Sequence, residues 1–166
     1  MADDAPTRPV THVGLMVSDI EAAIEWYEAL LRFETTAGPL RQQAGDPAAD
    51  RVRDLLGESF ASMQVAFLET GGGTDLGLSE FDATSGHADG SPSNVGFFHV
   101  GVVDPGLETL ASRIDETGGD HYADVWETYP GFHATYCFDP WRNRIEIYDR
   151  EFDPAALQPA DGDGSP

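Results

Sequence analysis

The sequence contains no lysine, and its nine basic residues, all arginine, are outnumbered by 30 aspartate and glutamate residues. The formal net charge is therefore −21 at pH 7. Nucleic acids and anionic lipids bind proteins through clustered lysine and arginine, which this composition does not supply. We therefore expect no nucleic acid and no membrane surface as partner, and a small molecule as substrate.

Cysteine and long apolar segments are also scarce. Cys137 is the sole cysteine of the sequence, so no internal disulfide can form, which fits a reducing compartment. No apolar run approaches the length of a membrane-spanning helix, and the first residues lack the basic and apolar regions of a signal peptide. These absences favour a cytoplasmic protein.

The acid-rich, lysine-free composition resembles that of proteins from halophilic archaea, whose cytosol is concentrated salt. At low ionic strength a net charge of −21 repels itself and opposes compaction. Molar salt shortens the range of that repulsion to a few ångströms. A halophilic source is therefore the interpretation we favour over a merely acidic mesophilic protein.

Two similar patterns of elements follow one another along the chain. Residues 1–9 and 151–166 form acidic tails expected to be poorly ordered, and residues 82–95, rich in Ser, Gly, Asp and Pro, form a linker. Between them, residues 10–81 and 96–150 each alternate as strand, amphipathic helix and three further strands. The expected class is α+β, with two tandem βαβββ modules that share one domain.

The first module is predicted to contain strands at 10–17, 33–40, 62–68 and 75–81 and a helix from Asp19 to Arg32, after a capping box that begins at Ser18. Residues 52–56 are an ambiguous helical turn. The second module is predicted to contain strands at 97–103, 121–126, 133–138 and 144–148, and a helix capped by Asp104-Pro105 that ends at Gly118-Gly119.

Three polar residues occupy matching places in these strands. His-Val-Gly occurs once at the start of each module, at His12 and His99, and Glu146 lies between Ile145 and Ile147 in the last strand. By the period of two, each of the three side chains lies opposite the apolar face of its strand. A lone Glu there is most often solvated, but three matching positions favour a metal site.

Paired βαβββ modules, a His at each start and the closing Asp139-Pro-x-x-Asn-Arg-x-Glu146 turn resemble the vicinal oxygen chelate superfamily. This superfamily includes glyoxalase I, extradiol dioxygenases and bleomycin- or fosfomycin-resistance proteins. The resemblance implies a curved mixed sheet around one divalent metal held by His12, His99 and Glu146. It favours Fe(II), with Mn, Ni, Co or Zn as alternatives, and it allows a homodimer.

Glyoxalases of the superfamily take a fourth ligand from the last strand of the first module, where this sequence has Gly77. Candidates for a missing ligand or base are Glu80, Glu69, Glu127 and His133. Two His and one Glu with open positions form the facial triad of non-haem Fe(II) oxygenases. Extradiol dioxygenases also carry a Tyr ten residues before the Glu, and Tyr136 has that spacing here. They have, in addition, an acid-base His at the position where this chain has Glu127.

The resemblance thus favours an extradiol-dioxygenase-like metalloenzyme acting on a small aromatic diol, with Tyr136 as catalytic residue. A glyoxalase I-like lyase or isomerase is the alternative, and a binding or resistance protein without turnover is the second alternative. The aromatic residues Trp126, Tyr129 and Phe132 are candidates to line the substrate pocket, although core or dimer contacts are an equally good interpretation.

The charge leads to a first prediction. The free energy of unfolding should rise with KCl into the molar range, because salt screens the repulsion among the acidic residues. Urea unfolding curves at 0.1, 1 and 3 M KCl measure it, with sucrose of matched water activity as the control. An unfolding midpoint that does not move between dilute and molar KCl would remove the halophilic interpretation.

Overall fold

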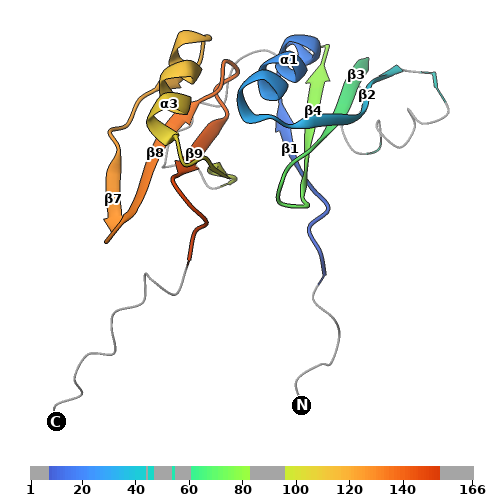
Figure 1. Cartoon of the computed structure of the whole chain (residues 1–166). Helices are drawn as coiled ribbons and strands as arrows, with labels where there is room; N and C mark the ends of the chain where they lie inside the picture. The colour runs from blue at the N-terminus through green and yellow to red at the C-terminus, as the bar shows by residue number, and fades with distance from the viewer. Residues whose placement is uncertain (1–7, 44, 47–53, 55–60, 83–95, 154–166) are drawn as a thin grey trace, which may run out of the picture. The chain divides into compact units, whose positions relative to one another are not determined.

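A computed structural model describes residues 8–43, 45–46, 54, 61–82 and 96–153. The chain divides into two compact units between Gly86 and His87, here called module 1 and module 2 (Figure 1). Most of the predicted linker, of the two tails and of the ambiguous turn at 52–56 lies outside the described residues. No helix in the described part of the chain is long and apolar enough to cross a membrane.

Module 1 has the predicted order of elements. It contains, in sequence, β1 (His12–Met16), α1 (Ile20–Leu31), β2 (Glu34–Gln43), β3 (Ser62–Glu69) and β4 (Asp75–Phe81). Its sheet has the order β1-β4-β3-β2, in which β1 runs parallel to β4 and the other pairs are antiparallel. β2 is longer than predicted, and β1 is shorter because it forms only where it meets β4.

Module 2 repeats this arrangement with one change. It contains β5 (Val100–Val103), α3 (Leu107–Glu116), β6 (Asp120–His121), β7 (Trp126–Tyr129), β8 (Phe132–Phe138) and β9 (Arg144–Tyr148). The sheet order is β5-β9-β8-β6, and β7 also pairs with β8. The single strand predicted at 121–126 is therefore wrong: β6 and β7 pair with opposite ends of β8, and residues 122–125 between them leave the ladder.

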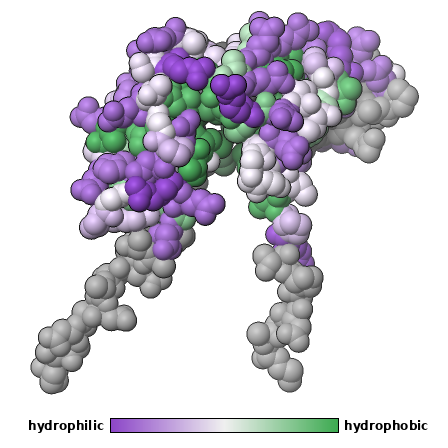
Figure 2. Space-filling model, in the orientation of Figure 1, coloured by the Kyte–Doolittle hydropathy of each residue, from purple (hydrophilic) through white to green (hydrophobic). Residues whose placement is uncertain are grey.

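Each helix covers one face of its own sheet (Figure 1). The N-cap of α1 is Asp19, one residue later than predicted, and its carboxylate accepts from the Ala22 N–H at 3.0 Å. α3 likewise begins after Gly106 rather than at Pro105, and its buried residues Leu107, Leu110, Ala111 and Ile114 are the predicted stripe. Hydrophilic residues dominate the outward surfaces of the helices (Figure 2).

The cores lie between helix and sheet. Leu15, Ala66, Leu68 and Leu78 are buried in module 1, and Ile114, Cys137, Ile145 and Ile147 in module 2. Burial also raises the pKa of Cys137 to about 12, so this residue is a protonated packing thiol. We call the opposite sheet faces the His12 face of module 1 and the Glu146 face of module 2.

A tight turn joins β8 to β9 and sets the register of Glu146. The buried Asp139 accepts backbone N–H bonds from Trp141 at 3.0 Å and from Asn143 at 2.7 Å. Arg142 has a φ of 70°, a left-handed conformation that favours glycine. Its guanidinium lies 4.1 Å above the Phe138 ring and 3.0 Å from Asp120, contacts that offset the unfavourable backbone.

Candidate functional site

The His12 face of module 1 has a buried glycine, Gly77, at the position where a fourth ligand was sought. The His12 ring is exposed and meets the Phe67 ring edge-on at 5.4 Å. A Cβ added to Gly77 would lie 3.4 Å from both His12 Cδ2 and Phe67 Cε1, which is ordinary contact. Gly77 therefore lies beside His12 and contributes no side chain, as the period of two predicts.

The Glu146 face of module 2 brings two predicted ligands together. His99 immediately precedes β5, and its Nε2 lies 2.9 Å from Glu146 Oε2. The Glu146 side chain is only 11% exposed, so its charge is largely removed from water. Nδ1 of His99 is buried and has no hydrogen-bond partner among the described residues, so the contact with Glu146 is the polar anchor of the ring.

Two tyrosines complete this face. Tyr136 pairs with Glu146 across β8 and β9, and burial, followed by the hydrogen bond and negative charge of Glu146, raises the pKa of Tyr136. The Tyr148 hydroxyl donates to Glu146 Oε2 at 2.5 Å, and its pKa is raised for the same reasons. Both phenols therefore stay protonated and serve as hydrogen-bond donors.

No role for Tyr148 was predicted from the sequence, although it lies two residues after Glu146 and therefore on the same face of its strand. The glycine of the second His-Val-Gly explains how its ring fits there. A Cβ at Gly101 would approach Tyr148 Cε2 to 3.1 Å, whereas a Cβ at Gly14 would meet nothing within 4 Å. The signal for Tyr148 was thus available in the Glu146-Ile-Tyr148 spacing together with Gly101.

The strand registers show which positions of the modules correspond. Gly14 pairs with Gly77 across β1 and β4, and Gly101 pairs with Glu146 across β5 and β9. Gly77 is therefore the counterpart of Glu146, and by the next ladder Phe67 is the counterpart of Tyr136. Module 2 has a carboxylate and a phenol where module 1 has a glycine and a phenylalanine.

The predicted fourth-ligand candidates of module 1 lie on different faces. Glu80 turns to the helix side of β4, where its Oε2 accepts from the Ile20 N–H at 2.8 Å and caps α1. The Glu80 acceptor is therefore engaged on the face opposite Gly77, and its role as a ligand or base stays a prediction. Glu69 ends β3 at an exposed position and alternates with Phe67 onto the His12 face.

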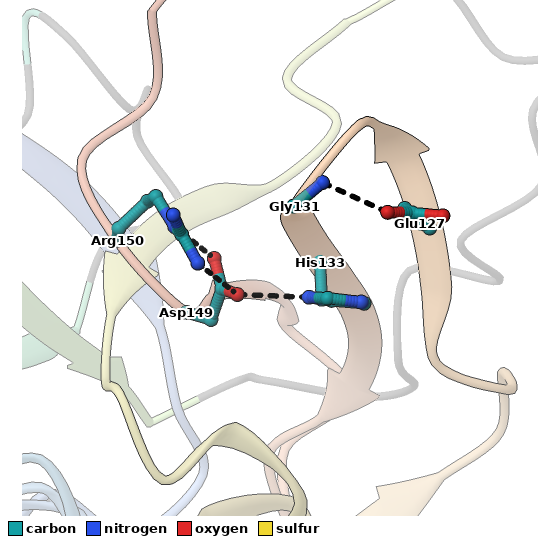
Figure 3. Close-up of polar contacts among 5 residues, drawn as sticks. All are labelled: Glu127, Gly131, His133, Asp149 and Arg150. Carbon is teal, nitrogen blue, oxygen red and sulfur yellow. Dashed lines mark hydrogen bonds and ion pairs between the residues drawn. The ribbon is translucent and has the colours of Figure 1, made fainter.

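The two candidates of module 2 form polar contacts with Asp149 and with Gly131 (Figure 3). His133 and Glu127 pair across β7 and β8 and alternate onto the face opposite Tyr136. His133 Nδ1 lies 2.9 Å from Asp149 Oδ2, and Glu127 Oε1 accepts from the Gly131 N–H at 2.8 Å. Both side chains therefore point to the face opposite Glu146 and Tyr136, because hairpin register decides which face they occupy, and their role as ligand or base stays a prediction.

Of the predicted pocket residues, Trp126 remains accessible. Its ring is 48% exposed and lies 5.9 Å from that of Tyr136 on the Glu146 face. Phe132 is 1% exposed beneath Tyr129, with ring centres 4.4 Å apart. Phe132 is therefore buried, and its assignment to a substrate pocket stays a prediction. Phe98 and Tyr122, missed from the sequence, are exposed beside Tyr136.

The pair His99 and Glu146 fits a divalent metal. Two donor atoms about 2.1 Å from one ion and at right angles lie about 3.0 Å apart, close to the 2.9 Å between Nε2 and Oε2. A neutral imidazole and an ionised carboxylate are a donor set for Fe, Mn, Co, Ni or Zn. Within each module alone, the described residues gather no group of three His, Cys, Asp or Glu side chains.

Residues 10–147 match the Glyoxalase/Bleomycin resistance protein/Dioxygenase superfamily. The fold and the match together show that the chain belongs to this superfamily. No curated protein matches the sequence. Solved structures, in contrast, match its fold.

A glyoxalase family protein from Bacillus cereus superposes with a TM-score of 0.69 at 20% identity, covering 89% of this chain and 97% of that one. A mutant fosfomycin resistance protein FosX from Listeria monocytogenes, complexed with Mn(II), gives 0.57 at 12% identity over 89% and 94%. A mutant glyoxalase I from Zea mays gives 0.59 at 16% identity over 87% of this chain and 46% of that one. At these identities the likeness shows the fold.

The His133 cluster of Figure 3 yields a second prediction. Hydrogen bonds from Arg150, followed by those from His133, hold the pKa of Asp149 well below its usual range although burial opposes this. A carboxyl group whose pKa is lower in the folded than in the unfolded protein stabilises the fold at pH values above its unfolded pKa of about 3.9. This stabilisation is lost as the pH falls through the folded pKa. Asp149→Asn should therefore lower the unfolding midpoint at pH 7 and lose its effect in strong acid.

Urea unfolding of wild type and Asp149→Asn at pH 7, 4, 3 and 2 measures this convergence. Glu151→Gln, which removes the same charge from an exposed neighbour, is the matched control. A difference between wild type and Asp149→Asn that stays constant from pH 7 to pH 2 would contradict the assignment.

Proposed function

We propose that the chain is a divalent-metal enzyme of the extradiol-dioxygenase type, acting on a small aromatic molecule with two vicinal hydroxyls. The observation that carries the proposal is the meeting of His99 Nε2 and Glu146 Oε2 at 2.9 Å beside the phenol of Tyr136. By its resemblance to the superfamily, His12 is the third ligand. When bound, the metal would act as a Lewis acid that holds both substrate oxygens and O2.

The chain's own residues would then bind and orient the diol. Tyr136, protonated and next to Glu146, donates a hydrogen bond to a substrate oxygen at the ligand pair. Trp126, Tyr122 and Phe98 present exposed rings on the same face, against which a flat aromatic substrate packs. In the proposed reaction both atoms of O2 enter the product as the ring carbon–carbon bond beside the hydroxyls breaks.

Gly77 favours this reaction class over the glyoxalase type. A metal held by three protein ligands keeps positions for a chelating diol and for O2, whereas a fourth carboxylate would occupy one of them. The counterpart of Glu146 in module 1 has no side chain. Glu127, which stands where dioxygenases have an acid-base His, lies on the face opposite Tyr136. Because this base is missing, substrate binding and turnover should be measured separately.

A glyoxalase I-like lyase or isomerase is the second candidate, and one observation favours it. Glu69 alternates onto the His12 face two residues beyond Phe67, whose ring contacts His12. A carboxylate there could serve as the fourth ligand and base of a redox-neutral proton transfer.

The ligand pair gives a third prediction. His99→Ala and Glu146→Ala should each abolish stoichiometric divalent-metal binding, measured by calorimetry with Mn(II) and Ni(II). His133→Ala removes a histidine from the opposite face of the same sheet and should leave the metal affinity unchanged. Far-UV circular dichroism checks that each variant folds. Full metal occupancy in both ligand variants would show that the proposed ligand set is wrong.

Gly77 gives a fourth prediction, which separates the two reaction classes. Gly77→Glu should place a carboxylate beside His12, tighten Ni(II) or Zn(II) binding about tenfold and suppress oxygen-dependent activity. Gly77→Met controls for side-chain size, and Glu80→Gln controls for a carboxylate on the helix side of β4. Weaker metal binding in Gly77→Glu, with activity abolished in Glu69→Gln, would instead support the lyase or isomerase.

A further inference from the structure

Two side chains converge on one oxygen atom of Glu146. The Tyr148 hydroxyl donates a hydrogen bond to Glu146 Oε2 at 2.5 Å, and His99 Nε2 lies 2.9 Å from the same atom. A carboxylate oxygen has two lone pairs, so it can bind a metal with one and accept a hydrogen bond with the other. The oxygen that faces the proposed ligand His99 is therefore also the oxygen that Tyr148 holds.

The ring of Tyr148 is itself fixed by its neighbours in module 2. Phe152 stacks on it, with ring centres 5.5 Å apart and an interplanar angle of 16°, and the buried Phe132 ring lies at 5.2 Å. On the side of β5, a Cβ added to Gly101 would lie 3.1 Å from Tyr148 Cε2 and 3.9 Å from the hydroxyl oxygen. The ring therefore occupies space that exists because residue 101 has no side chain.

Module 1 shows what the same ladder looks like without the carboxylate. Gly14 is the counterpart of Gly101, and Ser79, two residues after Gly77, is the counterpart of Tyr148. A Cβ at Gly14 would meet nothing within 4 Å, so no ring fills the corresponding space. The ring that fills the space beside the glycine thus occurs in the module that has the buried carboxylate.

A ligating carboxylate that is held by a hydrogen bond binds a metal without first losing side-chain freedom. Glu146 has several rotatable bonds, and Tyr148 follows it by two residues on the same face of β9. The hydroxyl therefore reaches Oε2 along the strand, from a different direction than His99, which precedes the neighbouring strand β5.

We propose that Tyr148 is the positioning residue of the metal ligand Glu146: its hydroxyl holds Oε2 toward His99, and Gly101 and Phe152 hold the hydroxyl in place. The inference rests on the proposed function for the metal and on the contacts within module 2 for the positioning. Its consequence is that Gly101, which contributes no donor atom, sets the metal affinity through Tyr148.

Calorimetric titration with Mn(II) tests this on wild type, Tyr148→Phe, Gly101→Ala and the double variant. Tyr148→Phe keeps the ring and removes the hydroxyl, and it should lower the metal affinity about tenfold or more. Gly101→Ala should displace the ring and lower the affinity as well, whereas the matched control Gly14→Ala should leave it unchanged. The double variant should bind no more weakly than Tyr148→Phe, because Gly101 acts through the hydroxyl.

A purely structural role of the ring would leave the metal affinity of Tyr148→Phe at the wild-type value, and that result overturns the proposal. So does a double variant in which the two losses of affinity simply add. Circular dichroism and urea unfolding check that each variant folds.

A second measurement separates failure of the positioning from failure of the proposed function. In the metal-free protein at pH 7, the effects of Tyr148→Phe and Glu146→Gln on the urea midpoint should not be additive, because the two residues share a hydrogen bond. If wild type binds no Mn(II) but this coupling is present, the proposed function fails and the positioning of the carboxylate stands. Additive effects in the metal-free protein overturn the positioning.

Discussion

A carboxylate buried in the middle of a strand constrains everything around it. Glu146 is 9% exposed, and an ionised carboxylate at such a position is costly unless it is paired or hydrogen-bonded. The partners that compensate it come from three neighbouring positions: His99 at the edge of β5, Tyr136 across β8 and Tyr148 two residues along β9. These partners are also the groups that a metal and its substrate would meet.

The geometry of this cluster depends on strand register. β9 lies between β5 and β8, and a slip of one residue would bury Arg144 and Tyr148 among the core residues and turn the isoleucines outward. The Asp139 turn fixes the β8–β9 register through backbone hydrogen bonds, and Gly101 leaves the space that the Tyr148 ring occupies. The turn and the glycine therefore act on the site although neither touches a ligand.

Alternation along single strands was predictable from the sequence, because the period of two needs no knowledge of neighbours. It placed His12, Gly77 and Glu146 on the faces where the structure has them. Positions that depend on how two strands pair were not predictable. The pairing of Glu127 with His133 across a bulged hairpin turned both away from Tyr136, and the break between β6 and β7 left Tyr122 and Trp126 to approach Tyr136 separately.

The burial of individual aromatic residues was also not predictable from the sequence, because sequence spacing does not show which ring lies beneath another. Phe132 became core, whereas Phe98 and Tyr122 remained at the surface and enclosed Arg144. Cation–π contacts of this kind leave no periodic signal, because their members come from β9, from the segment before β5 and from the loop after β6.

The repeat itself explains why the polar chemistry concentrates in one module. Both modules keep the same ladder, with Gly14 opposite Gly77 and Gly101 opposite Glu146. A carboxylate at position 77 would need hydrogen-bond donors of the kind that Tyr136 and Tyr148 supply to Glu146. Gly77 preserves the strand pairing without a charged side chain. Phe67, at the position that corresponds to Tyr136, has no hydroxyl that could donate a hydrogen bond to a carboxylate. The asymmetry between two equivalent strands therefore places the buried carboxylate in the module that supplies its hydrogen-bond donors.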